Sequence, residues 1–311
     1  MSGLLSVLVP TTITAAMLTS TTATSEGYAA WDKTKTYAVG DYCYSASTQH
    51  NYRSLVANNL NKDPTDAVNR TAATSSSIVY WQDLGPANPW AMFDKKIGTA
   101  TTANGNLTVV LRPGAFTDFY VVGVEGANSL TVTVRDAAGG EVVYTSTTAM
   151  EASAPDDYWE YFFDPFESQT DLLLTGLPPY GTGEATITLA GGGTVKCGAM
   201  AVGAVKVLGK SKADAEAEPT SFAFINTDQW GETDIVEGPS ATNLSVQATT
   251  DTRDDGRKAQ AIVTSLLGKP AFWFCSDRPD AAGLRTWGLG SGRFSYNSER
   301  CTISLTVKGM I

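Results

Sequence analysis

The sequence predicts a mainly β protein with several domains, on three observations. The chain has 311 residues, which is long for one domain. Thr, Ser, Gly, Val and aromatic residues gather in short runs, a composition that favours strands and tight turns over helices. Hydrophobic residues make up 42% and charged residues 17%, as in a globular chain. Changes in pattern divide the chain into residues 1–27, 28–87, 88–209 and 210–311.

The charge pattern argues against several classes of function. The net charge is −10 and no cluster of Lys or Arg occurs, so we expect no nucleic-acid-binding surface, which requires clustered cations. One histidine, His50, and four cysteines without CxxC spacing argue against imidazole catalysis and zinc clusters. We predict no catalytic residue, metal site or cofactor. Cys43, Cys197, Cys275 and Cys301 are predicted to be buried reduced thiols, in a protein assembled in a reducing cytoplasm.

Residues 1–27 begin with an apolar run that no Lys or Arg precedes and that Pro10 cuts short. The run therefore fits neither a secretory signal nor a bilayer-spanning segment, and no membrane insertion is expected. We predict an N-terminal arm whose apolar end docks on a neighbouring subunit. The docking residues would be Leu4, Leu5, Val7, Leu8 and Val9.

Residues 28–87 place aromatic residues around a Gly-Asp turn. Trp31 and Tyr37 precede Gly40 and Asp41, and the segment closes with Trp81-Gln-Asp-Leu-Gly. Between them lie Cys43, Tyr52 and Pro64. This order resembles the short chitin-binding-type carbohydrate module, although the polar stretch 69–77 departs from the family pattern as an inserted loop.

The resemblance implies that exposed rings stack on the faces of sugars. The rings that match by position are Trp31, Tyr37, Tyr52 and Trp81. The alternative is that these rings fill the core, because a small domain needs its large aromatic residues for buried area. Gly40 and Asp41 are predicted to form a turn in which the aspartate binds the backbone.

Residues 88–209 read as a β-sandwich. Strands are predicted at 107–111, 119–124, 130–134, 141–144, 171–174, 185–189 and 198–203. With residues 90–94 leading into the first strand and 198–208 closing the segment, the pattern resembles the discoidin-like, galactose-binding jelly roll. A further strand, apolar on both faces, is predicted at 158–163. The nearby acidic residues could suggest glycoside hydrolysis but are interpreted as a solvated loop; they are Asp156, Asp157, Glu160, Asp164 and Glu167.

Residues 210–311 combine strands with one helix. An acidic linker is predicted at 210–218, and strands at 221–225, 233–236, 243–248, 271–275 and 302–307. A helix is predicted at 254–268, starting with Asp254 and Asp255, which we interpret as helix-start residues and not as calcium ligands. Its apolar face would consist of Ala259, Ile262, Val263, Leu266 and Leu267. A β-sandwich with one packed helix resembles phage tail-tube and distal-tail proteins.

Two motifs in tandem, 81–86 (Trp-Gln-Asp-Leu-Gly-Pro) and 90–94 (Trp-Ala-Met-Phe-Asp), resemble a group of tailed-phage tail proteins. The resemblance implies a non-enzymatic structural component of the virion tail, at its tip, baseplate or an appendage. Its partners would be other tail proteins, copies of itself in a symmetric trimer or hexamer, and host surface glycans. Two alternatives stay open: a capsid decoration or structural adaptor without sugar binding, and a glycan depolymerase. Against the depolymerase, the chain lacks the long β-helical repeats common in tailspike enzymes.

Overall fold

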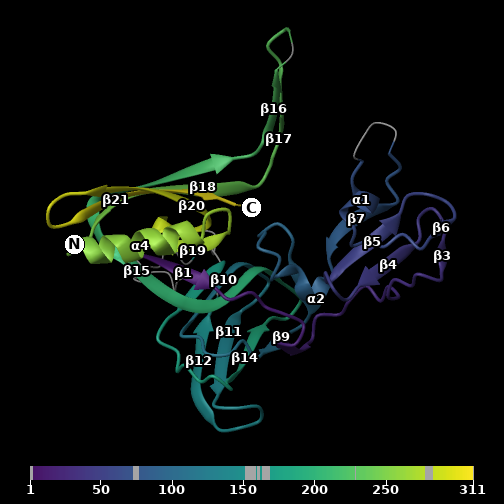
Figure 1. The fold of residues 1–311 in the computed structure, drawn as a ribbon, viewed down its shortest axis with the longest axis horizontal. Helices are drawn as coiled ribbons and strands as arrows, with labels where there is room; N and C mark the ends of the chain where they lie inside the picture. The colour runs from purple at the N-terminus through teal and green to yellow at the C-terminus, as the bar shows by residue number, and fades with distance from the viewer. Residues whose placement is uncertain are drawn as a thin grey trace.

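The structure is a computed structural model that describes residues 3–72, 77–150, 159, 162, 169–227, 229–276 and 283–310. It is mainly β, as the sequence predicts. Three bodies are visible in Figure 1: a small module, a β-sandwich, and a ring of strands with one longer helix beside it. A hairpin projects from the ring of strands.

The β-sandwich contains the alternating strands that the sequence predicts. One sheet has the order β12-β11-β14-β9-β2, and its three central strands alternate buried with half-buried side chains. Its strands are β2 (Leu18–Thr21), β9 (Leu107–Leu111), β11 (Ser129–Arg135), β12 (Val142–Ala149) and β14 (Glu184–Ala190). The sheet shares one hydrophobic core with β8 (Thr101–Asn104), β10 (Asp118–Glu125), β13 (Asp171–Leu174) and the first part of β15 (Thr194–Ser221).

Strand β15 runs for 28 residues through both larger bodies. Its first part pairs with β10 and β8, its middle with β1, and its last part with β18. The linker predicted at 210–218 is therefore wrong, since Lys210 pairs with Thr249 and Ala217 with Leu244. The predicted boundary between residues 209 and 210 falls inside this strand.

Six antiparallel strands close into a ring, which we call the barrel. Its strand order is β1-β19-β20-β21-β18-β15, and β15 pairs back with β1. The strands besides β15 are β1 (Leu4–Pro10), β18 (Ser240–Thr249), β19 (Ala271–Phe274), β20 (Arg285–Tyr296) and β21 (Cys301–Gly309). Closure leaves this ring without an open edge.

The N-terminal run closes the barrel instead of extending to another subunit. Val7 pairs with Lys206 on one side and Trp273 on the other. Leu5 and Val7 lie in the same core as Trp273, and Leu8 points to the other face, against Phe272. The side chains of Leu5, Val7 and Leu8 are fully buried. The predicted docking arm is therefore wrong for Leu5, Val7 and Leu8, because long-range pairing with the C-terminal strands buries both faces of β1.

The predicted helix is present as α4 (Arg253–Ser265). It begins at Thr252, whose side chain accepts a hydrogen bond from the Asp255 backbone amide. The face that contacts the barrel core consists of Ala259, Val263 and Leu266, with Ile262 packed at its edge. Leu267 is 56% exposed, contrary to prediction, because the helix has already ended at Ser265.

The small module has two short sheets. One has the order β4-β5-β7 and the other pairs β3 with β6. Its elements are β3 (Thr36–Tyr37), β4 (Tyr42–Ser45), β5 (His50–Ser54), β6 (Asn59–Leu60), α1 (Ala67–Arg70) and β7 (Trp81–Pro86), followed by α2 (Asn88–Ala91). The predicted turn is confirmed: Gly40 has φ +88°, and the Asp41 carboxylate accepts a hydrogen bond from the Ala38 amide at 2.8 Å.

The hairpin consists of β16 (Phe224–Thr227) and β17 (Thr233–Val236). The strand predicted at 233–236 matches β17, whereas the one predicted at 221–225 overlaps β16 only at residues 224 and 225; both were predicted as parts of a packed domain. In Figure 1 they rise away from the barrel, beyond the end of β18. The strand predicted at 158–163 is wrong at Trp159 and Phe162, which are helical. The acidic residues considered for catalysis, at 156, 157, 160, 164 and 167, lie outside the described residues.

Candidate functional site

Three of the four rings predicted to bind sugars form the core of the small module. Tyr37, Tyr52 and Trp81 are at most 1% exposed and pack together with Cys43. Trp31 is only partly buried and packs at the edge of this core. The structure therefore brings the four predicted residues together, but Tyr37, Tyr52 and Trp81 have no face to offer a sugar.

The polar atoms of these rings are satisfied inside the module. The indole Nε1 of Trp81 donates to the Lys62 carbonyl at 2.7 Å. The Tyr37 hydroxyl accepts from the Asp32 amide at 2.8 Å, and the Tyr52 hydroxyl pairs with the Thr48 hydroxyl at 3.0 Å. Such bonding is what a buried Tyr or Trp requires. The alternative interpretation, in which the rings fill the core, holds for these three.

The exposed aromatic residue of the module is one that sequence reasoning did not select. Tyr42 is 40% exposed and stacks on Tyr28, with 4.8 Å between ring centroids. The Arg53 guanidinium lies over the Tyr42 ring at 6.0 Å. Strand alternation could have indicated this, because Tyr42 points opposite to the buried Cys43. With Tyr28 and Arg53 both against it, the Tyr42 ring packs within the module.

His50 belongs to an ion-pair network with Asp83 and Arg70. Its Nδ1 lies 2.9 Å from Asp83 Oδ1, and Arg70 Nη1 lies 3.1 Å from Asp83 Oδ2. Partial burial raises the pKa of Asp83. Hydrogen bonds from the Gly85 amide and His50, with the charges of His50 and Arg70, outweigh that effect, so the pKa lies below its ordinary value. The network joins α1 to β5 and β7, a structural role.

All four cysteines are buried and free, as predicted. Burial raises the pKa of the Cys43 and Cys197 thiols to about 12 and that of Cys275 to about 11. Burial also raises the pKa of Cys301. Because the thiolate is the reactive form, these side chains are suited to packing and not to nucleophilic chemistry.

We expect no thiol of the native protein to react rapidly with a disulfide reagent at pH 8. At the pKa of about 12 of Cys43 and Cys197, the thiolate fraction at this pH is about one in ten thousand, and burial blocks access to all four thiols. The four cysteines should react only after unfolding in guanidinium, which serves as the control. Rapid reaction of one thiol per chain in the native protein would show that one of these buried sites opens to solvent.

The β16–β17 hairpin exposes apolar side chains on both of its faces. Phe224 pairs with Val236, and Ile225 pairs with Ile235 on the opposite face. These four side chains are 59–66% exposed, and Trp230 between the strands is 84% exposed. Contiguous exposed apolar surface of this kind marks protein–protein contact sites. The hairpin is thus the candidate site for assembly.

The hairpin is also acidic. Residues 222–239 contain no Lys or Arg, and four acidic residues occur there: Asp228, Glu232, Asp234 and Glu237. Glu232, Asp234 and Glu237 are exposed. An apolar surface with four negative charges fits a partner surface that is apolar and positive.

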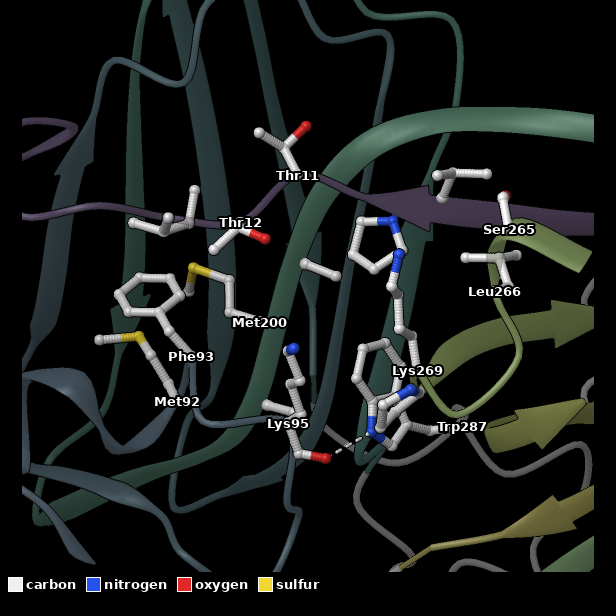
Figure 2. A pocket seen from close by; sticks show the side chains of 16 residues that line it. Thr11, Thr12, Met92, Phe93, Lys95, Met200, Ser265, Leu266, Lys269 and Trp287 are labelled. Atoms are coloured by element: carbon white, nitrogen blue, oxygen red, sulfur yellow. Dashed lines mark hydrogen bonds between the residues drawn. The ribbon is translucent and has the colours of Figure 1, made fainter. Parts of the chain in front are cut away.

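A cavity of about 280 Å³ lies where the sandwich meets the barrel; we call it the junction pocket (Figure 2). Met92, Phe93 and Met200 form one wall and Leu266 and Trp287 the other. The indole of Trp287 donates to the Lys95 carbonyl at 3.0 Å, which ties the two walls together. Lysine side chains enter the pocket at two positions, Lys95 and Lys269. Among the described residues that line it, none is acidic.

Neither a metal site nor a membrane span was found in the part of the chain that the structure describes. No group of three or more His, Cys, Asp and Glu residues there could hold a metal ion. No described helix is long and apolar enough to cross a bilayer. In comparisons with known proteins, no protein-family model and no curated protein matches the chain.

Sequence reasoning missed both the hairpin surface and the junction pocket. For the hairpin a signal was present: two predicted strands joined by a short segment that contains Trp230 and only acidic charges. For the pocket no local signal exists, because its lining comes from β1, the 92–95 turn, β15, the end of α4 and β20.

Proposed function

We propose that this chain is a non-enzymatic structural component of a tailed-phage virion, in the tail tip, baseplate or a tail appendage. It works by presenting surfaces to copies of itself and to other tail proteins. The observation that carries the proposal is the projecting β16–β17 hairpin, whose two faces expose apolar side chains and whose tip exposes Trp230. The assignment to a phage tail is supported by the tandem motifs at 81–86 and 90–94.

A hairpin of this kind calls for a covering partner. Two strands alone are marginally stable in water, and covering Phe224 and Trp230 would bury on the order of 300 Å² of apolar surface. At about 25 cal/mol per Å² this corresponds to about 8 kcal/mol before the cost of association. Selection against aggregation would remove such a surface from a protein that works as a monomer.

The burial of Tyr37, Tyr52 and Trp81 supports a purely structural role for the small module. The module packs beside the sandwich through α2, where the Asn88 side-chain amide donates to the carbonyls of Thr24 and Thr102 at 2.9 and 2.8 Å. The proposal therefore includes neither a sugar site at these rings nor a reaction.

The experiment is a comparison of solution mass with and without the hairpin. We expect the wild-type chain to form oligomers whose mass rises with concentration in light scattering. Replacing residues 224–236 by a short Gly-Ser turn should give a folded monomer, because the barrel strand β15 ends before the hairpin and β18 begins after it. Ile225→Ser with Ile235→Ser should weaken association in the same direction.

The matched control is Val142→Ser, which removes a similarly exposed apolar side chain from the edge strand β12. It should leave the oligomers unchanged. A wild-type chain that stays monomeric at every concentration would refute the proposed self-assembly. Electron microscopy of virions carrying a tagged chain tests the alternative of a capsid decoration, because the tag would then lie on the capsid and not on the tail.

A further inference from the structure

We infer that the hairpin tip of one copy inserts Trp230 into the junction pocket of a second copy. The inference rests on the proposed function, self-assembly through the hairpin, and goes beyond it by naming the receiving site. The occupant is the segment 222–239 of another copy of this chain. Trp230 is 84% exposed, so it does not occupy the pocket of its own copy.

Charge complementarity is the first support. The segment 222–239 has four acidic and no basic residues, whereas the junction pocket receives Lys95 and Lys269 and has no acidic side chain among its described lining residues. The chain as a whole has a charge of −10, so two copies repel each other over most orientations. A positive pocket on an acidic molecule favours the one approach in which opposite charges meet.

Shape and polarity are the second support. The pocket has a volume of about 280 Å³, just below the range of about 300–1,000 Å³ usual for ligand sites, and it suits one large side chain. Phe93 and Met200 on one wall face Leu266 and Trp287 on the other (Figure 2). Aromatic and thioether groups are favourable neighbours for an indole. Ser265 and Thr12 at the lining offer hydroxyls to its Nε1 hydrogen.

Reach is the third support. Trp230 lies nine positions beyond Ser221, the last residue of β15. At about 3.3 Å per residue the tip extends up to about 30 Å beyond the barrel strand. Figure 1 shows the hairpin directed away from the body, so its tip is available to a neighbour. Because hairpin and pocket are different surfaces, the contact is head-to-tail and repeats from copy to copy, in a ring or a stack.

Two variants test the contact from its two sides. Trp230→Ala removes the inserted side chain, and Thr12→Trp fills the pocket from an exposed lining position. We expect each variant alone to be a folded monomer, with the dissociation constant of self-association raised about 30-fold or more, as for a central Trp of an interface. Thr14→Trp is the matched control, since Thr14 is exposed on the same segment but does not line this pocket.

Mixing the two variants gives the sharpest result. The intact hairpin of the Thr12→Trp chain should enter the intact pocket of the Trp230→Ala chain, once, and growth should then stop. We therefore expect one-to-one heterodimers and nothing larger by native mass spectrometry. A contact of hairpin with hairpin predicts no such rescue, because each pair would contain one defective hairpin.

Charge reversal provides an independent readout. Lys95→Glu with Lys269→Glu should abolish wild-type association. Mixing this chain with an Asp234→Lys, Glu237→Lys chain should restore association, with the two chains in alternating order. The unchanged hairpin of the first chain meets the unchanged pocket of the second, and the two reversed surfaces meet each other.

The possible failures are distinguishable. If wild type assembles and Thr12→Trp assembles equally well, the pocket is not the receiving site, while the proposed self-assembly stands. If Thr12→Trp is monomeric but the variant mixture gives no heterodimer, the head-to-tail contact is refuted. If wild type never associates, both proposals fail together.

Discussion

Val7→Asp is expected to prevent closure of the barrel, at a cost of about 5 kcal/mol or more. Val7 is fully buried between β15 and β19, so aspartate would place an unpaired charge in the barrel core beside Trp273. Such a cost equals the whole stability of a marginal domain. Hydrogen exchange should show loss of protection in β19, β20 and β21, while β9, β11 and β14 of the sandwich stay protected.

Leu4→Asp is the matched control on the same strand. Leu4 is 47% exposed, so this change should shift stability by no more than about 0.5 kcal/mol. Deletion of residues 1–10 should reproduce the effect of Val7→Asp. Full protection of the barrel strands in the deleted chain would mean that β1 is dispensable and that the N-terminal run is an arm after all.

Leu266→Asp should have the second largest effect, about 3–5 kcal/mol. Leu266 is 4% exposed and lies in the barrel core, where it also lines the junction pocket. Leu267→Asp, one residue further on, changes a side chain that is 56% exposed and should be nearly neutral. The measurement is unfolding in guanidinium, monitored by hydrogen exchange of the individual strands, because a chain with several domains need not unfold in one step.

Equal destabilisation by the two leucine variants would mean that the helix packs by a different face. No destabilisation by either would mean that α4 does not contribute to the barrel core. The comparison is informative because the two positions differ in burial while sharing side chain, substitution and location.

The sequence predicted the fold well where the pattern is local. The alternating runs at 107–111, 130–134 and 185–189 became β9, β11 and β14, because a half-buried strand needs only its own alternation to be recognised. The helix was found from its apolar spacing and acidic start. Both signals lie within the residues that form the element.

Long-range pairing could not be predicted from the sequence. Leu4–Pro10 resembles an exposed arm in isolation, and only its partners β15 and β19 make it a buried strand. The Ala- and Glu-rich stretch 210–218 has weak strand propensity, yet pairing with β18 keeps it extended.

The candidate site was predicted least well. Residue type marked Tyr37, Tyr52 and Trp81 as important, but the choice between core and surface depends on strand register, which the pattern did not supply. The hairpin strands were predicted, and their exposure was not. The junction pocket depends on elements brought together only by the fold.

Pairing between the first and fourth of the barrel's strands in chain order constrains how the protein is made. Ser6 of β1 pairs with Phe274 of β19, so about 270 residues of translation separate the partners, roughly 15–50 s at ordinary ribosomal rates. Until β15 is made, the nascent chain carries an unpaired apolar strand, and one edge of β1 stays open until β19 follows. The hairpin at 224–236 is synthesised before β19, β20 and β21, so its exposed Trp230 is present before the barrel can close. A chaperone that shields both segments until release would keep unfinished chains from joining one another.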